Sequence, residues 1–204
     1  MDIRPQDDEV GSAGAMSMRF AEAAKQAFSF LERAGFRLTE SDPAQLKYES
    51  VQVFVTIEWD VRSGELEVFL SLQPRKGKAR DSFSLRDLLG MEGVDAPERK
   101  MPFQVAEEGK LKPFIDKLAE DTRRHAQPAL AGDRMYFRRL RAYRNAQAQM
   151  YMRDMELRRV RAEADKAWQK RELDKVVRLY ASIEGQLTVS EKAKLAYAKQ
   201  HQTH

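Results

Sequence analysis

Two carboxylates flank a tryptophan at the end of an expected strand, where Glu58 and Asp60 bracket Trp59. Because side chains alternate across a strand, both carboxylates lie on one face. Paired carboxylates can bind a divalent metal ion or serve as general acid and base. The next strand presents Glu65 and Glu67 instead of the lysine that a nuclease-like site would have, and charges that prevent edge-to-edge association also explain this pattern.

A second pair, Asp121 and His125, lies four residues apart on an expected helix. This spacing allows a carboxylate to orient an imidazole. No nucleophile or further histidine is placed to complete a site, so we expect a structural histidine at the edge of the core. Glycine-rich phosphate loops, nucleophile elbows and paired-histidine zinc motifs are absent from the sequence. We therefore expect no catalytic residue, no metal ligand and no bound cofactor.

Arginine dominates the charged positions between residues 134 and 161, where nine arginines stand against two acidic residues and no lysine. Arginine suits planar, bidentate contact with phosphate or carboxylate, and interleaved tyrosines can stack on a partner. The pattern fits a solvated or intramolecular face, a docking site for an acidic protein, or a nucleic-acid contact. The expected partner-binding residues are Arg134, Arg138, Arg139, Arg141, Tyr143, Arg144, Tyr151, Arg158 and Arg159.

The two parts of the chain differ in charge. Residues 131–204 hold 17 lysines and arginines against 9 aspartates and glutamates, whereas residues 1–130 hold 19 against 23. Such asymmetry concerns partners more than fold. We predict a disordered leader over residues 1–16, an α+β domain over 17–130 and a basic helical arm over 131–204.

Hydrophobic periodicity predicts the elements of the α+β domain. A helix from residue 17 ends at Gly35, and alternating apolar residues from 36 to 72 predict three to four antiparallel strands. Val51 and the apolar residues that follow it have the opposite parity to Leu46 and Tyr48, which requires a bulge or tight turn near residues 49–50. A short helix over 84–89 ending at Gly90 and a helix over 109–127 follow. Strand runs separate from helix runs indicate an α+β class with an antiparallel meander.

The arm is predicted to be entirely helical. Asp133 is the expected N-cap of a long helix that runs to about residue 169. Two shorter helices follow, one over 173–184 and one after Thr188, which forms a capping box with Glu191.

Residues 164–183 contain Ala164-Asp165-Lys166-Ala167-Trp168, a short polar turn and Val176-Val177-Arg178-Leu179-Tyr180-Ala181. This segment resembles one helical hairpin of the tetratricopeptide type, without a second copy. The resemblance implies a protein-binding scaffold.

Composition narrows the class of protein. The chain has no cysteine, which excludes disulfides, thiolate zinc sites and a thiol nucleophile. No apolar run is long enough for a membrane span, so we expect a soluble, cytoplasmic protein. Our leading hypothesis is a non-enzymatic adaptor or immunity-like protein of a bacterial-type cytosol that docks a protein through the arginine-rich helix, the acidic sheet or both. The alternatives are nucleic-acid binding through residues 134–161 and a metal-assisted enzyme at Glu58 and Asp60. The sequence does not determine the oligomeric state.

Overall fold

The computed structural model describes residues 19–60, 62–74, 81–94 and 108–201. The chain divides into two compact units, Met1–Arg144 and Asn145–His204. The boundary therefore falls within helix α7 (Arg134–Gln169), later than the expected change at residue 131. The leader expected over residues 1–16 lies outside the described residues.

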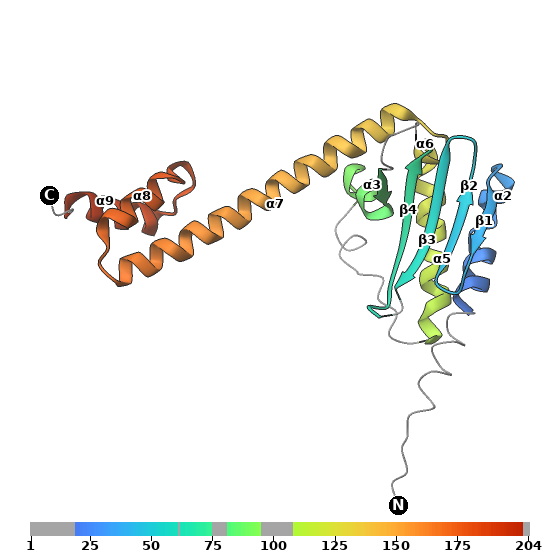
Figure 1. Cartoon of the computed structure of the whole chain (residues 1–204), viewed down its shortest axis with the longest axis horizontal. Helices are drawn as coiled ribbons and strands as arrows, with labels where there is room; N and C mark the ends of the chain where they lie inside the picture. Colours follow the sequence, from blue (N-terminus) through green and yellow to red (C-terminus); the bar gives the residue numbers. More distant parts are fainter. Residues whose placement is uncertain (1–18, 61, 75–80, 95–107, 202–204) are drawn as a thin grey trace, which may run out of the picture. The chain divides into compact units, whose positions relative to one another are not determined.

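The first unit contains an antiparallel meander whose strands are neighbours in sequence order (Figure 1). Its strands are β1 (Arg37–Ser41), β2 (Gln45–Glu49), β3 (Val53–Asp60), β4 (Glu65–Leu72) and β5 (Ser82–Ser84). The predicted α+β class is confirmed. The described sheet has five strands instead of three to four, because Ser82–Ser84 form an additional short strand that pairs with β4.

The change of parity in the sheet is produced by a tight turn between β2 and β3. The Ser50 hydroxyl accepts a hydrogen bond from the Val53 amide at 3.0 Å, and the Ser50 amide donates to the Val53 carbonyl at 2.9 Å. Leu46 and Tyr48 on β2 can therefore face the same core as the apolar residues of β3. Val51 itself lies in the turn and is exposed, so the buried apolar row of β3 begins at Val53.

Helices cover the buried face of this sheet. The covering elements are residues 19–27, α2 (Phe30–Arg33) and α5 (Glu108–His125), with the short α6 (Gln127–Leu130) after α5 (Figure 1). Phe20, Phe28 and Leu31 are fully buried against strand residues. Burying each such side chain contributes about 1.5–3 kcal/mol.

Helix α3 (Leu85–Met91) continues past the glycine that was expected to end it. Gly90 serves a different purpose, since a Cβ there would overlap the Tyr143 hydroxyl and lie 3.0 Å from Tyr143 Cζ. The first turns of α7 thus pack closely on α3 and β5, where Phe83 and Phe137 place their rings 5.9 Å apart. Asp133 caps α7 as expected, accepting the Met135 amide at 2.8 Å.

The second unit is a small helical cluster. Its described elements are the C-terminal part of α7, α8 (Leu173–Ala181), the 3-10 turn η1 (Glu184–Gln186) and α9 (Val189–Gln200). Val160, Ala164, Val176, Tyr180 and Leu195 form its buried centre. The predicted capping box of Thr188 and Glu191 is confirmed, whereas α8 ends at Ala181, before the expected residue 184.

The close contact between Gly90 and Tyr143 leads to a prediction about the free energy of unfolding. Replacing Gly90 with Ala improves helix propensity by up to about 1 kcal/mol, yet we expect a net loss of roughly 1–3 kcal/mol because the methyl group overlaps Tyr143. The measurement is urea unfolding followed by Trp59 fluorescence in a Trp168→Phe background, since these are the two tryptophans of the chain and each unit holds one.

The matched control is the double variant Gly90→Ala/Tyr143→Phe, which removes the overlapping hydroxyl but keeps the ring and should therefore recover part of the loss. Unchanged or increased stability in Gly90→Ala would contradict the close packing of α3 on α7.

Candidate functional site

The arginines of α7 divide into those bound by the fold and those left in solvent. In the first unit Arg141 pairs with Asp81, and Arg139 lies 5.8 Å from the centre of the Tyr136 ring. Arg134 and Arg138 are exposed and have no ion-pair partner within the described part of the chain. Among the predicted partner-binding arginines of the first unit, only Arg134 and Arg138 therefore have guanidiniums that make none of these contacts and can bind a partner.

Arg144 is held by three contacts within the first unit. Its Nη2 atom donates to Asp87 Oδ2 at 2.9 Å and to the Ser82 carbonyl, and its Cζ atom lies 4.1 Å from the centre of the Phe83 ring. Asp87 Oδ2 also accepts the Ser84 amide at 3.1 Å, which caps α3. Arg144 and the half-buried Tyr143 therefore hold α7 on its own domain. Their role in binding a partner stays a prediction.

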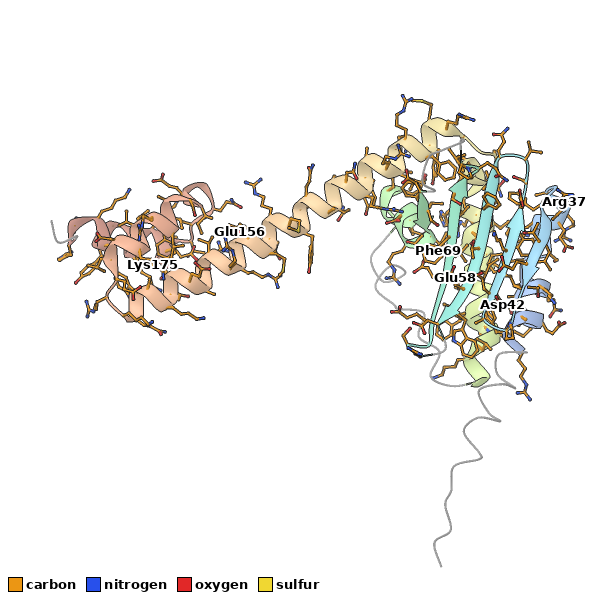
Figure 2. The ribbon with its side chains drawn as sticks, in the orientation of Figure 1. Arg37, Asp42, Glu58, Phe69, Glu156 and Lys175 are labelled. Carbon is orange, nitrogen blue, oxygen red and sulfur yellow. The ribbon has the colours of Figure 1, made fainter. Side chains whose placement is uncertain are left out.

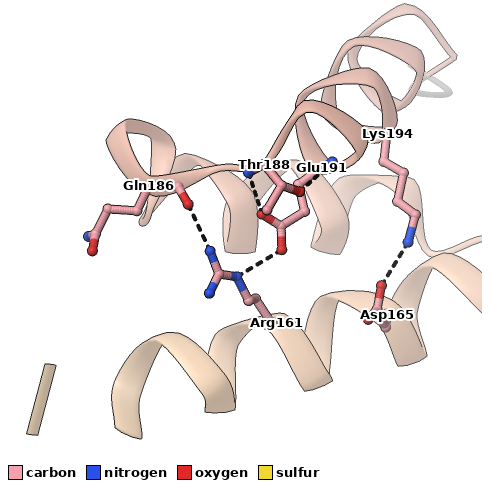
Figure 3. A network of polar contacts seen from close by, with 6 residues as sticks. All are labelled: Arg161, Asp165, Gln186, Thr188, Glu191 and Lys194. Atoms are coloured by element: carbon pink, nitrogen blue, oxygen red, sulfur yellow. Dashed lines mark hydrogen bonds and ion pairs between the residues drawn. The ribbon is translucent and has the colours of Figure 1, made fainter. Parts of the chain in front are cut away.

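Arg161 makes the same kind of contact in the second unit (Figure 3). It donates from Nε to Glu191 Oε1 and from Nη2 to the Gln186 carbonyl, both at 2.8 Å. The other oxygen of Glu191 accepts the Thr188 amide at 2.7 Å, so one carboxylate caps α9 and binds α7. Lys194 adds a bond to Asp165 at 2.8 Å.

These contacts change the acidity of Glu191. Burial alone would raise the pKa of Glu191, but the hydrogen bonds from Thr188 and Arg161 outweigh it and lower the pKa overall. The carboxylate is therefore stabilised in its charged form by the folded cluster.

Two further predicted arginines pair with neighbours on the same helix. Arg158 contacts Asp154 at 2.7 Å, and Arg159 contacts Glu156 at 2.7 Å and Glu163 at 3.5 Å. The paired residues are three or four positions apart and their side chains are largely open to solvent, so these pairs contribute little to stability. A partner could therefore displace them at small cost.

A segment of α7 follows the arginines that are bound within the first unit and precedes Arg158 and Arg159. It is exposed at every residue from 145 to 156. It carries no charge from Asn145 to Met152, and its large apolar side chains are Met150, Tyr151, Met152 and Met155, all exposed. Figure 2 shows this part of α7 with its side chains directed outward. The sequence prediction selected Tyr151 and missed the methionines, although three methionines within six helical residues could have drawn attention to them.

The carboxylates of the strand end are brought together, as their spacing indicated. Glu58 and Asp60 both line an open depression of about 540 Å³ on the outer sheet face, together with Asp42, Glu65 and Glu67. Figure 2 labels Glu58 beside Phe69, which also lines this depression.

Three of these carboxylates, those of Glu58, Asp60 and Glu67, each have a bonding partner of their own. Gln45 donates to Glu58 at 2.8 Å, and Asp60 accepts the Arg62 amide at 2.8 Å. Burial raises the pKa of Glu67, and Arg86 at 3.5 Å opposes that rise. Among the described residues, no group of three acidic or histidine side chains could hold a metal ion.

Asp121 and His125 do not form the pair that their spacing permits. Asp121 is buried and accepts Lys117 Nζ at 2.6 Å, one turn earlier on α5. No hydrogen bond joins Asp121 to His125 in the described structure, and the second Asp121 oxygen has no hydrogen-bond partner there. The imidazole is therefore not oriented by this carboxylate.

Comparison with protein-family models, curated proteins and solved structures finds no match for the chain. In the portion of the chain that the structure describes, no helix has both the length and the apolar character needed to cross a bilayer.

The contacts of Glu191 give a second stability prediction. Replacing Glu191 with Ala removes a helix cap and leaves Arg161 without its carboxylate, so we expect a loss of about 1–3 kcal/mol at pH 7. Because the folded pKa of Glu191 is lowered, its contribution is present above the unfolded pKa of about 4.3 and disappears as the pH falls through the folded value. Urea unfolding followed by Trp168 fluorescence in a Trp59→Phe background measures both effects.

Glu184→Ala is the matched control, since Glu184 is exposed and has no ion pair among the described residues. It should change stability by less than about 0.5 kcal/mol. Equal losses for the two variants, or a Glu191 effect that persists unchanged at pH 3, would refute the assigned role of the carboxylate.

Proposed function

We propose that the protein is a non-enzymatic interaction protein that docks a protein partner through the exposed stretch of α7, residues 145–156. The observation that carries the proposal is a fully exposed helical segment with four large apolar side chains, of which Tyr151 is 64% exposed. Methionine, tyrosine and arginine are enriched at protein interfaces. Clusters of exposed apolar side chains typically mark interaction surfaces.

The division of the arginines supports an acidic partner. Arg134, Arg138 and Arg153 are exposed without an ion-pair partner in the described structure, and Arg158 and Arg159 hold only exposed neighbours. Free and weakly engaged guanidiniums attract carboxylates and accelerate association. An adaptor or immunity-like role in a bacterial-type cytosol fits such a protein, as does the resemblance of residues 164–183 to a tetratricopeptide hairpin.

Nucleic-acid binding remains the second candidate, favoured by the exposed Arg134 and Arg138 one helical turn apart. It predicts that log affinity falls with log salt at about −0.9 per phosphate contacted. The uncharged residues 145–152 argue against a phosphate-tracking role for the middle of the helix.

The proposal is tested by placing p-benzoylphenylalanine at position 151 of the full-length chain in its native cells. We expect irradiation to produce a covalent adduct with one protein species, sensitive to protease and resistant to nuclease. The control places the same probe at Val189, an exposed apolar residue of the same unit that stands alone. The proposal fails if the two positions capture the same proteins equally, if neither captures any protein, or if the adduct is a nucleic acid.

A further inference from the structure

One side of α7 in the second unit carries a regular heptad-like row. Its residues are separated alternately by four and three positions, the spacing by which one helix packs along another. We call this row the seam, and it consists of Ala146, Met150, Arg153, Leu157, Val160, Ala164 and Ala167.

Only part of the seam is covered by the chain itself. Val160, Ala164 and Ala167 are buried in the cluster with α8 and α9, and Leu157 is half-buried at its border. Ala146 and Arg153 are exposed, and Met150 is 65% exposed. The same packing surface therefore continues for two further turns with nothing of this unit lying on it.

Arg153 is the only charged residue of the seam, and it has no ion-pair partner among the described residues. The acidic side chains nearest to it in sequence are already engaged, Asp154 by Arg158 and Glu156 by Arg159. A helix laid on this part of the seam would cover Met150 and face a free guanidinium. Leaving that guanidinium buried and unpaired would be costly, so the covering surface must supply a carboxylate.

We propose that the occupant of the exposed seam is an amphipathic α-helix of a partner protein, with an apolar stripe over Ala146 and Met150 and a carboxylate opposite Arg153. It continues the packing that α8 and α9 begin at Leu157 and Val160. This inference rests on the proposed function and specifies the partner and the face of α7 that it contacts.

The charge of the seam favours this occupant over a second copy of the chain. The seam contains no carboxylate, so pairing two seams would bring together Arg153 and apolar residues without the required acid. The small Ala146 side chain also allows a helix to approach within the usual 8–10 Å between axes. Apolar spacing of this period is matched by another helix and not by an extended strand.

The opposite face of the same stretch supplies a matched control. At 3.6 residues per turn, Met152 lies about 200° around the helix from Met150. The two methionines are equally exposed, 66% and 65%. Replacing each with glutamine therefore makes the same chemical change on two different faces.

The test uses the full-length protein and two fluorescently labelled synthetic amphipathic helices of about four heptads. They share one leucine stripe, and the positions flanking it are glutamate in one peptide and lysine in the other. Anisotropy should show the glutamate peptide binding at least about tenfold more tightly, and Arg153→Glu should reverse the preference. Met150→Gln should weaken binding of the glutamate peptide about fivefold or more, whereas Met152→Gln and Val189→Gln should change it less than about twofold.

The inference is overturned if neither peptide binds, if Arg153→Glu leaves the preference unchanged, or if Met152→Gln costs as much as Met150→Gln. Self-association that depends on Met150, measured by sedimentation, would assign the seam to a second copy instead. If the probe at position 151 captures a protein while the peptides show no preference governed by Arg153, the proposed function stands and this inference fails. If both experiments fail, both proposals fail. Circular dichroism of each variant checks that the exposed substitutions leave the fold intact.

Discussion

The structure depends on bonds from arginines of α7 to carboxylates that already cap other helices. Arg144 binds Asp87, which caps α3, and Arg161 binds Glu191, which caps α9. In both cases the same guanidinium also bonds a backbone carbonyl just ahead of the capped helix, at Ser82 and at Gln186. A charged hydrogen bond contributes about 1.5–3 kcal/mol where its groups are shielded from water. The Arg144 and Arg161 side chains are 41% and 35% exposed, so each bond here contributes less than that. Each unit thus couples α7, a helix start and a preceding segment through one carboxylate.

Some arginines of α7 stabilise the fold and others are free to bind a partner, and a count of charges does not distinguish them. A guanidinium that satisfies a capping carboxylate and a carbonyl is committed to the fold, and removing it would leave a partly buried carboxylate without its counter-charge. A guanidinium such as that of Arg138 or Arg153, which is exposed and has no ion-pair partner among the described residues, remains free for a visiting carboxylate or phosphate. The net positive charge of residues 131–204 is therefore larger than the positive charge that is free to interact with a partner. Exposed apolar side chains of the same helix become correspondingly more important for recognition.

Most helices and strands could be predicted from hydrophobic periodicity and capping residues, because these patterns involve residues close together in the sequence. The α+β class, the N-cap Asp133 and the capping box of Thr188 all follow from periodicity or cap spacing. The need for a residue without a side chain at position 90 could not be predicted, because it comes from Tyr143, which is distant in sequence. For the same reason the sequence could not show which arginines meet Asp81, Asp87 or Glu191. The exposed methionines were missed because methionine on a helix ordinarily fills a core.

The uncovered stretch of α7 has a consequence for how it stays helical. Twelve residues are near the lower limit at which an isolated peptide forms a helix in water, because the first turn is difficult to nucleate. Here the turns on both sides are already formed and bonded, so the stretch only has to propagate helix through residues such as Ala146, Gln149 and Met150, which favour it. The stretch is therefore helical because the turns at its two ends are held in place. Loosening the guanidinium contact at either end should let amide hydrogens in the middle exchange faster with solvent, although no atom there has been touched.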